Sequence, residues 1–223
     1  MTAPPSSSAR PAWPLPLLCA LLPLLATVVA WSLSVRDGWI DACNPFWDGC
    51  TSISRAARHG AGNQVFKALV LPAAALQALF WFRCSRWLAA AGRGGSGAVA
   101  ALGVVAGLAL ALYASFLGSE GEIYRALRRY GVTLYFASTY LALLLALRAL
   151  ARAPVDRAAA ALRGIAVVML FLGLASTAVA AAGLDGALRD RIGNALEWQL
   201  GVWLTAMFGV FAWRWRSRAA GSS

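Results

Sequence analysis

Six long apolar stretches constrain this chain more than any other feature. They cover approximately residues 13–34, 65–82, 97–118, 130–147, 164–184 and 192–213. About 20 apolar residues in a helix are enough to cross the hydrocarbon core of a bilayer. A helix also satisfies its own backbone hydrogen bonds, which lipid cannot do. The sequence therefore predicts an all-α, polytopic membrane protein in which six transmembrane helices form one bundle.

The overall composition supports lipid as the solvent. Hydrophobic residues make up 60% of the chain and charged residues 13%, and the mean hydropathy is +0.65. Soluble proteins have roughly 45–50% apolar and about 25% charged residues, so this chain has too little polar surface to cover a water-facing globule. The net charge of +11 does not indicate nucleic acid as a partner, because the basic residues lie at the ends of the apolar stretches.

The order of polar and apolar segments predicts the domain organisation. We expect a disordered cytoplasmic N-terminus at 1–12, a six-helix membrane domain at 13–214 with an outer loop at 35–65, and a cytoplasmic C-terminal tail at 215–223. The first apolar stretch could alternatively be a signal peptide cleaved after Ala30. We favour an uncleaved helix, because signal peptides have apolar cores of about 7–15 residues and this stretch is longer.

Charge and tryptophan placement predict that both termini are cytoplasmic. In that orientation the cytoplasmic side has a small excess of basic residues, as the positive-inside rule requires. Trp31 and Trp39 would lie at the outer interface, and Trp13, Trp81 and Trp213 at the inner one, which is the depth that indole rings favour. All but one of the 20 basic residues are arginine, which is typical of GC-rich bacterial coding. We therefore expect a bacterial inner (plasma) membrane protein.

The longest polar interruption, residues 41–66, contains Cys43, Cys50 and the only histidine, His59. Under the predicted orientation the two cysteines face an oxidising compartment, where a disulfide between them is plausible. They lack the further nearby ligands that a zinc site needs, so we predict no metal and no cofactor. His59 could act as a general base, although a lone loop histidine is usually only solvated.

A carboxylate, Glu197, lies within the last apolar stretch, where an unpaired charge is costly. Helical spacing places Asn194 and Gly201 on the same face. Two readings remain open for Glu197. It could form a salt bridge with an arginine of another helix, or it could belong to a functional site.

The expected partners of Glu197 are the arginines that precede the fourth apolar stretch, Arg125, Arg128 and Arg129. These side chains could extend toward the interface without a specific ligand, which is the commoner case. They could instead bind an anionic headgroup, because the guanidinium group pairs well with phosphate.

Gly103 and Gly107 in the third stretch have the GxxxG spacing that allows two helices to approach closely. Packing within the chain is the favoured interpretation. A homodimer through these glycines is the alternative.

Three segments in this order resemble the DRAM/Sfk family of six-span membrane proteins, which includes GPI-anchor-remodelling and yeast ceramide-remodelling relatives. They are CTSISRAARHGAGNQVF at Cys50–Phe66, RRYGVTLYF at Arg128–Phe136, and the pair Glu197-Trp198. Where the family loop has acidic residues, this chain has Arg55 and Gly62-Asn63, so a role that depends on those acids does not carry over to it. Asn63 is a further candidate binding residue. The resemblance implies a role in lipid handling or membrane organisation.

Three functions follow from these observations. The leading one is non-enzymatic binding of membrane lipids, including anionic ones, at the outer leaflet through Arg128, Arg129, Glu197 and the first loop. The second is a lipid-modifying enzyme that uses Glu197 or His59 as an acid or base. The third is a small homo-oligomeric transporter, although the broken helices typical of such proteins are not evident.

Overall fold

The computed structural model describes residues 12–92, 96–151 and 156–220, and every regular element in these ranges is a helix. The elements are α1 (Pro14–Arg36), α2 (Ile53–Ala56), α3 (Gly60–Ala90), α4 (Ser96–Ser115), α5 (Glu122–Leu150), α6 (Arg157–Ala181) and α7 (Gly186–Ala220). All except the short α2 are long and apolar enough to cross a membrane. The predicted all-α bundle of six transmembrane helices is therefore confirmed.

Several helices extend beyond the apolar stretches that predicted them. α3 begins at Gly60, continues through Pro72 and has 31 residues, which corresponds to about 46 Å. α7 has 35 residues and includes part of the segment expected as a C-terminal tail. The additional residues at the ends of these helices are largely polar or charged, so hydropathy alone underestimates the lengths of the helices. The expected disordered N-terminus at 1–12 lies outside the described residues, except for Ala12.

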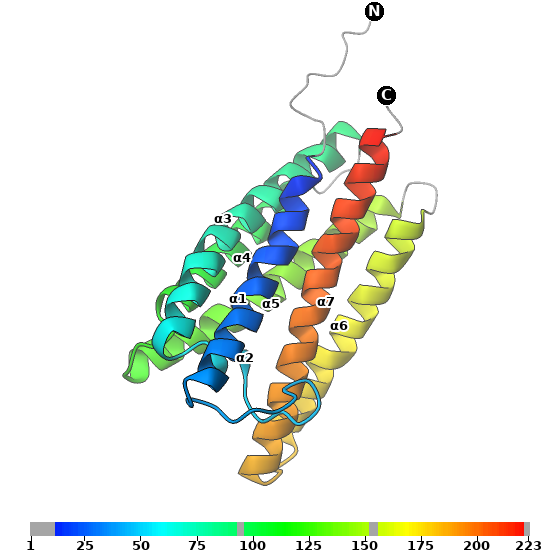
Figure 1. The fold of residues 1–223 in the computed structure, drawn as a ribbon. Coiled ribbons are helices and arrows are strands. Elements are labelled where there is room, and N and C mark those ends of the chain that lie inside the picture. The colour runs from blue at the N-terminus through cyan, green and yellow to red at the C-terminus, as the bar shows by residue number, and fades with distance from the viewer. Residues whose placement is uncertain (1–11, 93–95, 152–155, 221–223) are drawn as a thin grey trace, which may run out of the picture.

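The six long helices form an incomplete ring. α3 packs against α1 and α4, α4 packs against α5, and α7 packs against both α6 and α1. Contact between α5 and α6 is sparse by comparison. The start of α1 and the end of α7 lie at one end of the bundle, here called the terminal end (Figure 1). The connection between α1 and α3 lies at the opposite end, here called the loop end (Figure 1).

An aromatic cluster holds the terminal half of the bundle together. Phe80 and Trp81 of α3 pack against Phe208, Phe211 and Trp215 of α7, and all five side chains are almost fully buried. The ring centroid of Phe80 lies 5.2 Å from that of Phe208 and 5.1 Å from that of Phe211. Such edge-to-face pairs add to the packing energy of the buried area.

The small residues of α4 pack within the chain. A Cβ atom at Gly103 would lie 2.0 Å from the Cβ of Trp81, and one at Gly107 would lie 2.8 Å from the carbonyl oxygen of Ala74. Both glycines therefore allow α3 and α4 to approach closely, which is the favoured interpretation of the GxxxG spacing. The face of α4 that contains these glycines is covered by α3 of the same chain. A homodimer interface through Gly103 and Gly107 would therefore require α3 to move away.

The helix α6 separates from the rest of the bundle toward the loop end. Its buried residues all lie in the first half, between Ala158 and Met169. The first half is fixed by an ion pair between Arg214 and Asp156, and by the hydroxyl of Tyr140, which donates to the carbonyl of Ala166 at 3.1 Å. The second half, by contrast, contains no buried residue. The boundary between α5 and α6, here called the seam, is therefore closed at the terminal end and open at the loop end.

Candidate functional site

The loop between α1 and α3 is folded tightly onto the bundle. Cys43 and Cys50 are joined by a disulfide with a Cα–Cα distance of 6.6 Å. The hydroxyl of Ser52 accepts a hydrogen bond from the amide of Arg55 and caps the single turn of α2. Ser is a preferred residue at this capping position, so the local sequence itself explains why the chain turns here.

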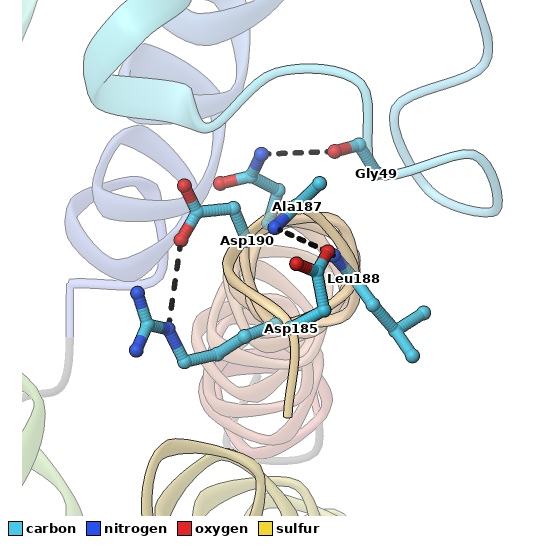
Figure 2. A network of polar contacts seen from close by, with 7 residues as sticks. Gly49, Asp185, Ala187, Leu188 and Asp190 are labelled. Atoms are coloured by element: carbon cyan, nitrogen blue, oxygen red, sulfur yellow. Dashed lines mark hydrogen bonds and ion pairs between the residues drawn. The ribbon is translucent and has the colours of Figure 1, made fainter. Parts of the chain in front are cut away.

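Side chains of α7 hold the loop by its backbone. Arg191 Nε donates to the carbonyl of Asp48 at 3.1 Å. The side-chain amide of Asn194 donates to the carbonyl of Gly49 at 2.8 Å, and Figure 2 shows this bond at Gly49. Further along, Trp198 Nε1 donates to the carbonyl of Thr51 at 2.9 Å, and Gln199 Nε2 donates to that of Phe46 at 3.2 Å. A row of donors on one helix face therefore satisfies the loop carbonyls, which lack partners of regular secondary structure.

The same helix also supplies an acceptor. The carboxyl group of Glu197 lies close to the backbone amides of Ile53 and Ser54, in the first turn of α2. Within the described residues Glu197 forms no salt bridge with Arg125, Arg128 or Arg129, so the expected ion pair is not observed. Glu197 therefore faces the start of α2 and shares the lining of one cavity with the arginines of α5 without pairing with them.

Two residues of α1 and α3 complete the attachment of the loop. The hydroxyl of Ser34 donates to the carbonyl of Ala56 at 2.6 Å, and the bond is buried. The amide of Asn63 donates to the carbonyl of Ala57 at 2.9 Å and to that of Leu117 at 3.0 Å. Asn63 therefore joins the loop to the turn between α4 and α5. Asn63 and Asn194 both serve to tether the loop.

A polar cavity of about 340 Å³ lies beneath α2, at the open seam between α5 and α6. Its lining combines basic, hydroxyl-bearing and apolar residues of the loop and of four helices: Ser54, Arg58, Tyr113, Arg125, Arg128, Arg129, Val132, Thr133, Phe136, Ser176, Gly193, Glu197 and Leu200. Four arginines and one glutamate make the cavity strongly positive. A concave, charged chamber of this size can enclose a phosphate-sized anion together with its hydration water.

The four arginines of the polar cavity differ in their partners. Arg128 donates from Nη1 to the carbonyls of Phe116 and Ser119, which fixes the turn between α4 and α5. Arg58 and Arg125 lie close enough for their charges to act on Arg128. In the part of the chain that the structure describes, Arg58 Nε is buried without a hydrogen-bond partner. Buried donors are normally satisfied, so this nitrogen is a candidate ligand contact.

An apolar pocket of about 110 Å³ adjoins the polar cavity. The two share four lining residues: Tyr113, Val132, Phe136 and Glu197. The pocket extends into the bundle toward Gln77 and Tyr135, whose side chains are hydrogen-bonded to each other at 2.9 Å. The ligand space at the loop end therefore has a polar and an apolar part in direct contact, with Glu197 at their boundary.

The candidate residues from the sequence divide into three groups. Glu197, Arg128 and Arg129 line the polar cavity. Asn63 and Asn194 hold the loop in place. His59 lines neither cavity, and its ring stacks on that of Trp39 with a centroid distance of 4.8 Å.

Sequence reasoning missed three residues of the site, Ser54, Arg58 and Tyr113. Ser54 and Tyr113 line the same cavity although 59 positions separate them, and Arg58 reaches the cavity from the turn after α2. No local pattern distinguishes Arg58 from other basic loop residues. Tyr113 lies in an apolar stretch and looks like an ordinary core residue. In the described ranges, no three His, Cys, Asp or Glu side chains come together in a way that could hold a metal ion.

The comparisons with known proteins add no family to these observations. No protein-family model matches the chain, and neither a curated protein nor a solved structure matches it significantly.

Proposed function

We propose that this integral membrane protein binds an anionic membrane lipid at the loop end without chemically altering it. The observation that carries the proposal is the polar cavity, in which Arg58, Arg125, Arg128 and Arg129 surround a space that opens between α5 and α6. A lipid headgroup could reach this space from the side, because the second half of α6 leaves the seam open.

The surroundings of Glu197 favour binding over catalysis. An acid or base catalyst must be able to exchange a proton with the reacting group. Among the described residues that line the polar cavity, Glu197 has no second carboxyl group and no histidine beside it, so an acid–base pair is not formed there. His59, the other residue considered for catalysis, lies outside both cavities.

The resemblance to the DRAM/Sfk family and the orientation of the protein in the membrane are also part of the proposal. The three segments that resemble the DRAM/Sfk family lie close together at this site: Trp198 donates to the carbonyl of Thr51, two residues before α2, while Arg128 lines the same cavity as Glu197. A loop closed by a disulfide suits an oxidising compartment. We therefore place the loop end at the outer leaflet of a bacterial inner membrane.

Native mass spectrometry of the detergent-solubilised protein tests the proposal. We expect phosphatidylglycerol to be retained in preference to phosphatidylethanolamine, and the double substitution Arg125→Ala, Arg129→Ala to reduce retention at least tenfold. Arg125 and Arg129 are preferred to Arg128 because Arg128 also fixes the turn between α4 and α5.

The matched control is Arg148→Ala, which removes an exposed arginine from the terminal end of the same helix. Retention should stay at the wild-type level in this variant. Equal retention of the two lipids by the wild-type protein, or equal losses in the double variant and in Arg148→Ala, would refute the proposal.

A further inference from the structure

We infer that the apolar pocket between α1 and α7 holds one hydrocarbon chain of the same lipid whose headgroup occupies the polar cavity. The inference rests on the proposed function and adds the binding site of the hydrocarbon chain. The anionic lipid is bound with its headgroup and one chain on opposite sides of Glu197.

Adjacency of the two spaces is the first support. Tyr113, Val132 and Phe136 line both of them, so the headgroup space and the chain space are at most one side chain apart. Tyr113 also shares the lining of the polar cavity with Ser54 and Arg58. Its ring can therefore lie against the first methylene groups of a chain while its hydroxyl faces the headgroup.

The second support is the chemistry of the pocket. Carbon-rich side chains such as Phe66, Val70, Leu204 and Phe208 form most of its wall. An apolar cavity of comparable size, about 150 Å³, remains free of water and accepts small hydrocarbons in another protein. A space of about 110 Å³ thus suits a segment of an aliphatic chain better than it suits water.

The third support is an opening toward the bilayer. Leu24 and Val28 of α1 and Val202 of α7 line the pocket and are 40%, 47% and 43% exposed. Gly201, next to Val202, also lines the pocket, and its Cβ position faces Ile53 Cδ1 of α2 at 3.3 Å. The remainder of a long chain can leave the pocket past the exposed side chains of Leu24, Val28 and Val202 and continue in the hydrocarbon core.

Photo-crosslinking tests the inference directly. The full-length protein is placed in nanodiscs of phosphatidylethanolamine that contain a small fraction of phosphatidylglycerol with a diazirine in the middle of one chain. We expect labelled peptides from the pocket-lining segments of α1 and α7, and we expect an excess of unlabelled phosphatidylglycerol to suppress this labelling about tenfold.

One substitution that fills the apolar pocket is compared with a control substitution outside it. Thr27→Phe adds bulk inside the pocket, whereas Thr177→Phe adds the same bulk to an exposed face of α6. Both threonines donate to the carbonyl four residues earlier at 2.8 Å, so the local helical effect is matched. Thr27→Phe should lower the competed labelling about tenfold, as expected for an overfilled site, and Thr177→Phe should leave it unchanged. Thr205→Phe, which fills the pocket from α7, should repeat the effect of Thr27→Phe.

The outcomes separate this inference from the proposed function. Labelling that is spread over lipid-facing helices and is not competed would overturn the chain site. If phosphatidylglycerol is still retained through Arg125 and Arg129 in that case, headgroup binding stands alone. Unchanged labelling in both Thr27→Phe and Thr205→Phe would also overturn the chain site. A wild-type protein that retains no phosphatidylglycerol would overturn both proposals.

Discussion

At the residue scale, Glu197 and Trp198 are adjacent residues of α7 that both face the loop. The carboxyl group of Glu197 lies close to two backbone amides of α2, and Trp198 donates to the carbonyl of Thr51. Glu197 is accommodated at the loop end without a salt bridge to the arginines that line the same cavity. An intramembrane acid is a functional candidate by default, and we expect this one to position α2 over the polar cavity.

We expect Glu197→Gln and Glu197→Leu to differ in the order of α2. The amide oxygen of Gln can still accept a hydrogen bond, whereas Leu leaves the two amides without an acceptor, at a cost of about 1–3 kcal/mol for each buried donor. Hydrogen exchange of the peptide that contains Ile53 and Ser54 measures the effect. Exchange should rise strongly in Glu197→Leu and only slightly in Glu197→Gln. Equal exchange in wild type and Glu197→Leu would contradict the assigned role.

At the element scale, α7 is the support on which the loop and the cavity are built. Its loop-end half contributes Arg191, Asn194, Trp198 and Gln199 to the loop carbonyls. Its terminal half contributes the aromatic cluster that packs against α3. The helix α7 thus connects the packed core directly to the loop, which has little regular structure of its own.

The close contact of the loop with α7 depends on Gly49. Its φ angle is +57°, and a Cβ atom there would lie 1.8 Å from the carbonyl oxygen of Arg191. Gly49→Ala should therefore displace the loop and lower the melting temperature in detergent. Gly38→Ala is the matched control, because Gly38 has a φ of +73° but open space around its Cβ position. Gly38→Ala should lower the free energy of unfolding only by the backbone strain, which is about 1–2 kcal/mol. Equal decreases in the two variants would show that close packing at Gly49 is unimportant.

At the scale of the whole molecule, asymmetry between the two ends of the bundle creates the cavity. At the terminal end, α5 and α6 are joined through Tyr140, and α6 and α7 are joined through Asp156 and Arg214. At the loop end, α6 has no buried residue and the seam contains the four arginines. Charge is thus concentrated where the packing is open.

The orientation of the whole molecule can be tested with single cysteines. Trp47 is 79% exposed at the loop end, and Arg163 is exposed in the half of α6 near the terminal end. We expect a membrane-impermeant maleimide to label Trp47→Cys in intact cells and Arg163→Cys only after permeabilisation. The two native free cysteines, Cys19 and Cys84, are buried and should not interfere. The reverse labelling pattern would place the loop end in the cytoplasm.

Much of the fold could be predicted from the sequence, because the membrane reduces folding to a question of which segments are apolar enough to cross it. The six helices, their order and the position of the main loop follow from hydropathy. Helix ends do not, because their polar residues are stabilised by partners from other elements. Lys67, Pro72 and Gln77 interrupt the second apolar stretch, and the structure places the side chain of Gln77 in a buried hydrogen bond with Tyr135.

The sequence by itself determined the class of the protein, since long apolar stretches are local properties. Only the tertiary structure decided which residues meet. It placed Glu197 beside the start of α2 without a salt bridge to an arginine of α5, stacked His59 on Trp39, and brought Arg58 and Tyr113 into the lining of the polar cavity. The physical reason is that these contacts join residues far apart in the chain. Their energies depend on distance and burial, neither of which is encoded in any short segment.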